Sequence, residues 1–369
     1  MRAGVRKMPL PMVDPMTSAM AEIRPRRLGS ESVGMVTSPT LTRLAVVRER
    51  HVPLVVLCVN TSAWHHRYAV LLAVSTFLLV IAGGLVTSTG SGLAVPDWPL
   101  SFGQVFPRME GGVLFEHGHR MVAATIGLMT ILMAVWTWRI ESRRWVRNLG
   151  LVMLAVVIVQ GLLGGLTVLM KLPDAVSISH AGLAQIFFSL TVVMAAVTSP
   201  RYRSVTRYPL PVTRLQGLSI AAVAIVYAQI ILGAIVRHKG AGLAIADFPM
   251  AQGRIIPEFT SSLVAWHFAH RVFALLVAGH VVMCAIRALR SRESWLTTPA
   301  WSLIALIAAQ ILLGGLTIWS GRAVAWTTAH VAAGALILVT SVVLALRVSR
   351  LAAAGNREAV AEPVMEGVA

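Results

Sequence analysis

The apolar positions of this chain gather into eight long runs that are separated by shorter polar stretches. The runs lie at about 68–87, 118–138, 147–169, 177–198, 216–236, 266–286, 300–319 and 324–346. Each run is long enough for an α-helix to cross a hydrocarbon core of about 30 Å. The pattern therefore predicts an all-α integral membrane protein with eight transmembrane helices.

A five-residue motif near the start of the second run recurs about half a chain later. The motif EHGHR at 116–120 returns as HFAHR at 267–271. The similarity extends to QGLLGGLT at 160–167, which returns as QILLGGLT at 310–317. We infer a duplication, in which two pseudo-repeated four-helix bundles occupy residues 66–200 and 201–350.

Composition and charge agree with a membrane location. Hydrophobic residues make up 56% of the chain and charged residues 13%, and the mean hydropathy is +0.75, outside the range of soluble domains. The net charge of +17 comes from basic residues between the runs rather than on one face, so no nucleic acid partner is expected. By the positive-inside rule, the basic loops after the second, fourth and sixth runs and both termini face the cytoplasm of a multi-pass cell (inner) membrane protein.

The ends of the chain differ from the rest. Residues 1–65 are rich in Arg, Pro, Ser and Met without a helical apolar period, so we expect a mobile cytoplasmic segment. The apolar stretch at 52–59 is too short to span a bilayer, and residues 351–369 are expected to form a cytoplasmic tail. The cysteines Cys58 and Cys284 fall in different parts of this plan, so neither a disulfide nor a thiolate metal site is expected.

Four histidines occupy repeat-related positions near the outer ends of the even-numbered predicted helices. They are His119, His180, His270 and His330. A polar ring inside a bilayer usually faces the bundle interior, and neutral imidazole is a common axial ligand of haem iron. A single histidine at a helix end is more often an interfacial hydrogen-bonded residue. Recurrence at four paired positions favours two bis-histidine haem sites, or one such site and an open pocket.

Other residues recur with these histidines, and each has two interpretations. Arg120 and Arg271 follow the motif histidines, where a guanidinium can pair with haem propionates or extend to the lipid headgroups. Glycine pairs such as 83–84 and 164–165 permit close approach to a porphyrin face or to another helix. The outer-loop segments DWP at 97–99 and DFP at 247–249 are expected to cap the pockets. The sequence has no GxGxxG, P-loop or HExxH motif, so nucleotide and zinc chemistry gain no support.

One position breaks the repeat, because Glu116 stands where the second copy has His267. Glu116 precedes His119 by three residues, so the two side chains share one face of a helix. A carboxylate beside a haem can relay protons or steer a reactive intermediate, whereas the simpler interpretation is a glutamate stabilised by a helix N-terminus. The asymmetry favours one half for chemistry, with Glu116 as the catalytic candidate, and one half for electron storage.

The chain resembles the haem A synthase family over about 68–346. The resemblance rests on the eight runs, the pseudo-repeat, TGSGLAVPDWPL at 89–100, the E-x-x-H-R motif at 116–120 and the later histidines. It implies an oxidoreductase that converts a methyl group of haem O to a formyl group by successive hydroxylations, making haem A for cytochrome oxidase. It also implies that His119 and His180 hold the substrate haem, that His270 and His330 bind haem b, and that Glu116 matches a functionally important glutamate. The implied partner is the prenyltransferase that makes haem O, and the electron donor is left open.

The chain departs from that family in its first outer loop. Many members have two cysteines where this chain has Val95 and Ser101, so a loop thiol or disulfide takes no part here. The residues alone also leave two other functions open. A dihaem electron carrier of the cytochrome b kind would use the same histidines but gives no reason for Glu116. A transporter would be expected to have broken spans or charged residues at mid-membrane, which the sequence lacks apart from the isolated His280.

Overall fold

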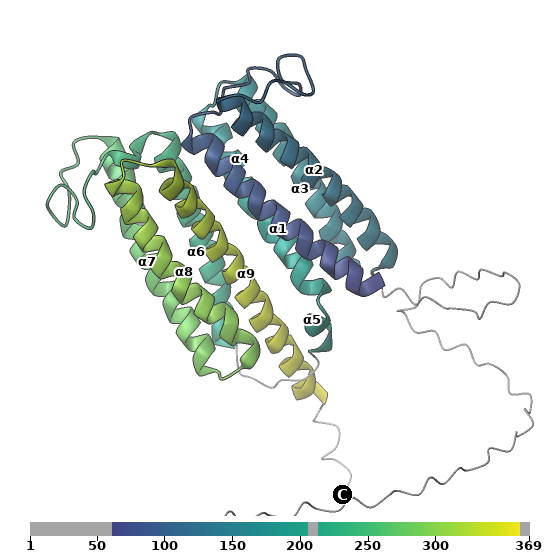
Figure 1. The fold of residues 1–369 in the computed structure, drawn as a ribbon. Helices are drawn as coiled ribbons and strands as arrows, with labels where there is room; N and C mark the ends of the chain where they lie inside the picture. Colours follow the sequence, from purple (N-terminus) through teal and green to yellow (C-terminus); the bar gives the residue numbers. More distant parts are fainter. Residues whose placement is uncertain (1–60, 206–212, 362–369) are drawn as a thin grey trace, which may run out of the picture. The chain divides into compact units, whose positions relative to one another are not determined.

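The structure is a computed structural model in which residues 61–205 and 213–361 are described. Residues 1–60, which include Cys58 and most of the predicted N-terminal segment, and the last part of the predicted tail, 362–369, lie outside the described residues. The described elements are all helical (Figure 1). They are α1 (Thr61–Ser88), α2 (Gly112–Ile140), α3 (Arg144–Leu169), α4 (Asp174–Thr198), α5 (Pro200–Ser204), α6 (Thr213–His238), the 3-10 turn η1 (Ala241–Leu243), α7 (Ser262–Arg290), α8 (Ser294–Trp319) and α9 (Val324–Ala361).

Eight of these helices, α1 to α4 and α6 to α9, are long and apolar enough to span a membrane. The prediction of an all-α membrane protein with eight spans is therefore confirmed. The helices extend beyond the apolar runs, because a run marks only the hydrocarbon-crossing part of a helix. Thus α1 begins at Thr61, inside the segment expected at 1–65, and α9 continues to Ala361, inside the expected tail.

Local sequence determines where several helices begin and end. The Ser261 side chain accepts a hydrogen bond from the Val264 N–H at the start of α7, which satisfies one of the free amides of a first helical turn. Helices α3 and α8 end alike: Leu172 and Arg322 both have positive φ, at 59° and 68°. Their N–H groups donate back to Thr167 O and Thr317 O, each at 2.7 Å.

Within each half the four spanning helices pack in a ring. Helix α1 contacts α2 and α4, and α3 contacts the same two helices, while α6 and α8 each contact α7 and α9. Each half has its own buried core. The first contains Leu72, Ile126, Met133, Met153 and Met194, and the second contains Val281, Leu296, Leu303, Leu344 and Leu351.

The two halves meet along α1 and α4 of the first half and α6 and α9 of the second. Contacts join α1 to α9, α4 to α6 and α4 to α9. A separate apolar cluster lies here, in which Phe188 of α4 is buried with Ala335 and Val339 of α9, and Phe77 of α1 packs against them. Apolar packing therefore connects the halves across helices that also carry predicted ligands.

Two loops of like construction, 89–111 and 239–261, which the sequence analysis expects on the outer face, connect α1 to α2 and α6 to α7. The carboxylate of Asp97 accepts hydrogen bonds from the N–H groups of Phe102 and Gly103 at 2.7 and 2.8 Å. Asp247 does the same with residues 252 and 253, at 2.8 Å each. These backbone bonds lower the pKa of both carboxyl groups, because they favour the charged form. The aspartates therefore hold each loop in a closed turn, and this likeness supports the inferred duplication.

Candidate functional site

In the first half, both predicted ligands lie against a glycine of the preceding helix. A Cβ atom on Gly83 of α1 would lie 3.2 Å from Cε1 of His119 in α2. A Cβ atom on Gly164 of α3 would lie 3.1 Å from Cε1 of His180 in α4. The two histidines interact electrostatically, so α2 and α4 bring them into one site. A Cβ atom at either glycine would make the imidazole beside it shift by a few tenths of an ångström.

The second half repeats this arrangement. A Cβ atom on Gly233 of α6 would lie 3.0 Å from Cε1 of His270 in α7, and one on Gly314 of α8 would lie 3.3 Å from Cε1 of His330 in α9. His270 and His330 also interact electrostatically. The glycine pairs noted in the sequence thus serve helix approach at the positions where the histidines need room.

Glutamines lie beside three of the four rings, and sequence reasoning did not identify them. The distances between the glutamine Nε2 and a ring nitrogen are 3.4 Å for Gln160–His180, 3.1 Å for Gln229–His270 and 3.4 Å for Gln310–His330. Each glutamine precedes its glycine by four residues, about one helical turn, so the two lie on the same face of the helix. The recurring pattern Q-x-x-x-G could therefore have identified these glutamines from the sequence. The first-half counterpart of Gln229 is Leu79, so the surroundings of His119 are less polar on this side.

These residues fit a haem in each half. A ring nitrogen is buried without a hydrogen-bond partner, among the described residues, in His119, His180 and His330. A buried polar atom without a partner is costly, and iron is a partner that an imidazole nitrogen readily takes. Within residues 61–205 and 213–361, no three His, Cys, Asp or Glu side chains form a cluster suited to a metal ion. The paired imidazoles suit coordination of a haem iron by two histidines.

Glu116 is buried in the first turns of α2, and its carboxylate is directed to the outer loop. Its Oε2 accepts a hydrogen bond from the Val95 N–H at 2.9 Å, and its Oε1 accepts one from Arg120 Nη2 at 2.7 Å. Arg120 also donates to the backbone oxygens of Asp97 at 2.7 Å and Leu100 at 3.1 Å. Glu116 and Arg120 together fasten loop 89–111 onto the helix that carries His119. Direct action of the carboxylate beside a haem stays a prediction.

The second half fastens its loop with a neutral acceptor in place of the carboxylate. The Ile245 N–H donates to His267 Nδ1 at 3.2 Å. Arg271 donates to the backbone oxygens of Ile245 at 3.0 Å and Met250 at 2.9 Å. Glu116 and His267, which distinguish the two motifs, therefore both hold their loop against the helix. Among the described residues, a buried ion pair lies at this point in the first half only.

The two loop positions at which this chain departs from the resemblance are buried. Val95 and Ser101 are both 0% exposed. Ser101 Oγ lies 2.8 Å from Nδ1 of His117, so the His117 ring is directed to the loop. Each residue along a helix is rotated by about 100° from the one before it, so His117 does not share a target with His119, two residues later. In the second half the corresponding loop residues are Ile245 and Ala251, also buried. A side-chain hydrogen bond and apolar packing therefore hold the first loop in place.

Cationic residues of α6 lie at the boundary between the halves. Arg237 donates to Ser88 Oγ of α1 at 2.7 Å and to Gly84 O at 3.3 Å. It also interacts electrostatically with His330, and its neighbour His238 interacts with His180. Arg237 thus places a positive charge at the boundary between the halves.

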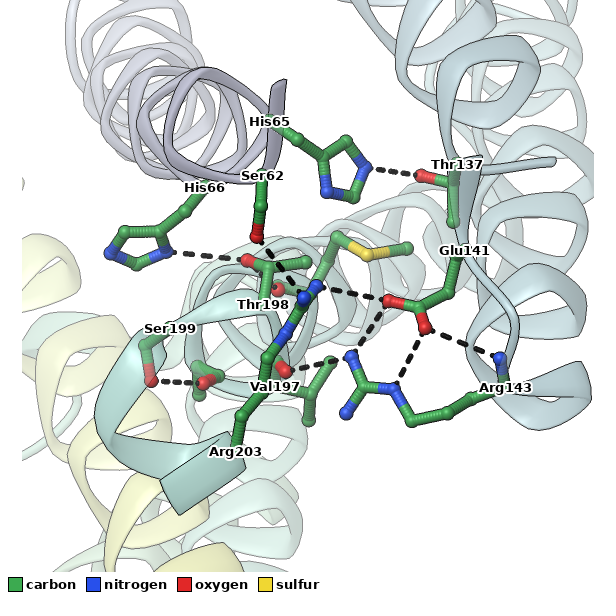
Figure 2. A network of polar contacts seen from close by, with 12 residues as sticks. Ser62, His65, His66, Thr137, Glu141, Arg143, Val197, Thr198, Ser199 and Arg203 are labelled. Atoms are coloured by element: carbon green, nitrogen blue, oxygen red, sulfur yellow. Dashed lines mark hydrogen bonds and ion pairs between the residues drawn. The ribbon is translucent and has the colours of Figure 1, made fainter. Parts of the chain in front are cut away.

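A second polar network lies at the opposite end of the first half (Figure 2). Glu141, which follows α2, pairs with Arg143 at 2.7 Å and with Arg203 of α5 at 3.1 Å. Arg203 also donates to Ser62 of α1 at 3.1 Å, and His65 Nε2 lies 2.9 Å from Thr137 Oγ1. Burial acts to raise the pKa of Glu141, but the hydrogen bonds and charges of the two arginines outweigh it and lower that pKa. The sequence analysis did not identify this network, which ties α1, α2 and α5 together.

Comparison with known proteins identifies the family of this chain. The family model COX15-CtaA, described as cytochrome oxidase assembly protein, matches residues 66–343. A protein of Symbiobacterium thermophilum is 33% identical over 252 residues, which cover 65% of this chain and 80% of the relative. One of Shouchella clausii is 32% identical over 216 residues, covering 58% and 72%, and one of Bacillus pumilus is 28% identical over 269 residues, covering 70% and 87%. All three relatives are named "Heme A synthase".

Proposed function

We propose how this chain, which belongs to the COX15-CtaA family and has the function of a haem A synthase, an oxidoreductase, divides its reaction between its halves. In this proposal the first half oxidises haem O and the second half supplies electrons. The halves are residues 66–200 and 201–350. In this proposal the co-reactant is O2: each of two hydroxylations inserts one oxygen atom into a C–H bond of the substrate's methyl group, while two electrons and two protons reduce the other atom to water. The hydrated aldehyde that results loses water to give the formyl group of haem A. The observation that carries the division is that a buried ion pair, Glu116 with Arg120, stands beside only the first histidine pair.

In this proposal His119 and His180 hold the substrate haem, and His270 and His330 hold haem b. The glycine beside each ring and the unpartnered ring nitrogens support both assignments. Haem iron bound in the second half supplies one-electron oxidation and reduction. Gln229 and Gln310 hold the second-half rings in place, as residues around a haem ligand commonly do.

Glu116 is the catalytic candidate of this proposal, and it also positions the loop, because its carboxylate oxygens accept hydrogen bonds from the Val95 N–H and from Arg120. A closed loop 89–111 excludes water from the pocket beneath it, which protects a reactive site from side reactions. Arg271 keeps a buried Nε without a partner among the described residues, and this donor is suited to a haem propionate. Arg120 would have to exchange a loop carbonyl for a propionate, since its terminal nitrogens already donate to the loop and to Glu116.

The membrane orientation and partners follow the same reasoning. Arginines such as Arg139, Arg144 and Arg201 lie at the end of the helices away from the four histidines, which supports cytoplasmic termini and haem sites toward the outer face. The prenyltransferase that makes haem O is the proposed source of substrate.

The test is to express the chain in a host that makes haem O but lacks haem A, then extract and separate the haems with mass detection. We expect haem A or its hydroxymethyl precursor from the wild type. His119→Ala and His180→Ala should abolish product while haem b stays bound, and His270→Ala should lose haem b. Haem b as the sole product, with haem O demonstrably present, would instead support the dihaem electron carrier. Loss of haem b from the His119→Ala protein with His270→Ala unaffected would reverse the assignment of the halves.

A further inference from the structure

Three arginines converge at the end of the helices that lies away from the four histidines. They are Arg201 of the short helix α5 and Arg347 and Arg350 of α9. Two aromatic rings bring them together, because the Tyr202 ring of α5 meets the Trp295 ring of α8 edge-on at a centroid distance of 6.3 Å. We call these three arginines and two rings the arginine cluster.

The guanidinium groups lie against the two rings. Arg201 and Arg347 lie over the Trp295 ring, with their Cζ atoms 5.9 and 5.4 Å from its centroid. Arg350 lies over the Tyr202 ring at 5.5 Å. Arg347 also donates a hydrogen bond to Trp295 O at 2.6 Å, and Arg350 donates one to Tyr202 O at 3.4 Å. The face of an aromatic ring attracts a cation, so these contacts fix the positions of three positive charges.

Among the side chains that the structure describes, at 62–205 and 214–353, no carboxylate pairs with the cluster. Arg201 and Arg347 interact electrostatically, and two cations repel each other. Glu293, just before α8, accepts a hydrogen bond from a backbone N–H at 3.1 Å rather than from an arginine. Arg203 of the same short helix differs, because it pairs with Glu141 at 3.1 Å. The cluster is therefore a site of uncompensated positive charge.

The three arginines also have nitrogens left for a ligand. Arg201 donates from Nη2 to Ser294 Oγ at 3.5 Å, Arg347 donates from Nη1 and Arg350 from Nε. Arg201 is exposed, and no nitrogen of Arg347 or Arg350 is buried without a partner, so the remaining donors reach the surface. A phosphate group suits them, because one guanidinium can donate to two of its oxygens at once.

The location of the cluster indicates the source of that phosphate. It lies where the span of α8 begins, at Ser294, and where the span of α9, 324–353, ends. Arginine and aromatic side chains at the ends of spans lie at the level of the lipid headgroups. We propose that the arginine cluster binds the phosphate of an anionic phospholipid, which offsets the repulsion between its cations. This inference does not depend on which half binds which haem.

The bound lipid would connect the two halves of the protein. Helix α5 follows α4 of the first half, whereas α8 and α9 belong to the second, and α5 lies beside the last turns of α9 (Figure 1). A phosphate held by Arg201 and Arg347 together therefore links the halves at the end opposite to the histidines. A lone arginine at this end is attracted to an anionic membrane surface but makes no such link.

The test measures lipid binding to the full-length protein, purified in a neutral detergent and freed of lipid. It is titrated with phosphatidylglycerol, with zwitterionic phosphatidylcholine and with inorganic phosphate. Native mass spectrometry counts bound lipid, and thermal unfolding reports the effect of each addition on stability. Arg347→Gln is the main variant, and Arg201→Gln, at an exposed position, is a second one in case the first does not fold. Arg290→Gln is the matched control, because it removes an exposed cation at the same end of α7, outside the cluster.

We expect phosphatidylglycerol to bind and to raise the temperature of unfolding, and phosphatidylcholine to do neither. Each of the two cluster variants should weaken phosphatidylglycerol binding about fivefold, the effect of losing one arginine near a headgroup. Arg290→Gln should bind it as the wild type does. Equal weakening in Arg290→Gln would overturn the proposal, since general attraction to an anionic surface would then account for the binding. Unchanged binding in both folded cluster variants would overturn it too.

Two further results would assign the cluster to another occupant and reject the lipid. The first is inorganic phosphate that stabilises the wild type as much as phosphatidylglycerol at the same concentration, which would indicate a soluble anion. The second concerns the glutamates of the C-terminal segment, Glu358, Glu362 and Glu366. If their replacement by glutamine strengthens phosphatidylglycerol binding about fivefold or more, the chain's own carboxylates occupy the cluster in the full-length protein.

Discussion

Replacing Glu116 tests whether its carboxylate holds the outer loop or acts in the chemistry. The side chains of Glu116 and Arg120 are only 5% and 16% exposed, so water screens their interaction little. Glu116→Ala removes two hydrogen bonds to a charged group and leaves the Val95 N–H without its acceptor. Such bonds are each worth about 1.5–3 kcal/mol. Arg120 keeps its loop carbonyls, so its charge is not isolated, and we expect a loss of about 3 kcal/mol in the free energy of unfolding.

Glu116→Gln separates the two roles. The amide oxygen of glutamine can still accept a hydrogen bond from the Val95 N–H. We therefore expect Glu116→Gln to lower the free energy of unfolding by about 1.5 kcal/mol, half the loss expected for Glu116→Ala. The assay is equilibrium unfolding in mixed detergent micelles, followed by tryptophan fluorescence, with haem A formation measured on the same variants. If Glu116 is a positioning residue, Glu116→Gln retains a substantial part of the product that Glu116→Ala loses.

The chain offers a matched control for this experiment. Glu258 pairs with Arg254 at the same i,i+4 spacing and at 2.6 Å, but both side chains are 64% exposed. Exposed pairs are worth little, so Glu258→Ala should cost no more than about 0.5 kcal/mol. The reasoning is refuted if Glu116→Ala is as stable as Glu258→Ala. It is also refuted if Glu116→Gln keeps wild-type stability yet makes no product, which would assign the carboxylate to the chemistry.

Three other sites give measurable outcomes. Gly233→Ala places a methyl group 3.0 Å from Cε1 of His270, so this variant should lower the haem content of the second half about tenfold. The control is Gly279→Ala, whose Cβ meets nothing within 4 Å, and its haem content should equal that of the wild type. Arg237→Gln removes a cation that interacts with His330. In a redox titration, the midpoint potential of the second-half haem should therefore become more negative. An unchanged potential would contradict the electrostatic link between Arg237 and His330. Glu141 has a lowered pKa, so its stabilising effect is present above the ordinary carboxyl pKa and is lost as the pH falls through the lower folded value. Thermal unfolding from about pH 7 to 3 should therefore show a smaller acid loss of stability in Glu141→Gln than in the wild type.

Hydropathy was sufficient to predict the spans, because apolar runs of about 20 residues match the length of a membrane-spanning α-helix rather than that of a β-strand. The repeat was sufficient to single out the four histidines, and the structure brings His119 to His180 and His270 to His330. The partners of Glu116 were not predictable. Helical spacing places it on one face with His119, but the loop that takes its carboxylate folds back over the helix, and no local pattern records that return. The network around Glu141 was missed for the same reason, since its arginines come from separate parts of the chain.

The contacts between glycines and histidines have a consequence for how the protein is made. Each predicted ligand and the glycine beside it belong to consecutive helices: α1 and α2, α3 and α4, α6 and α7, or α8 and α9. A nascent chain enters the membrane in the order of translation, so each helical hairpin can form as soon as its second helix emerges. In the first hairpin of each half, the imidazole is then seated against the neighbouring backbone before the opposing histidine has been synthesised. On the proposed assignment of the histidines, haem binding would join two hairpins whose ligands are already oriented.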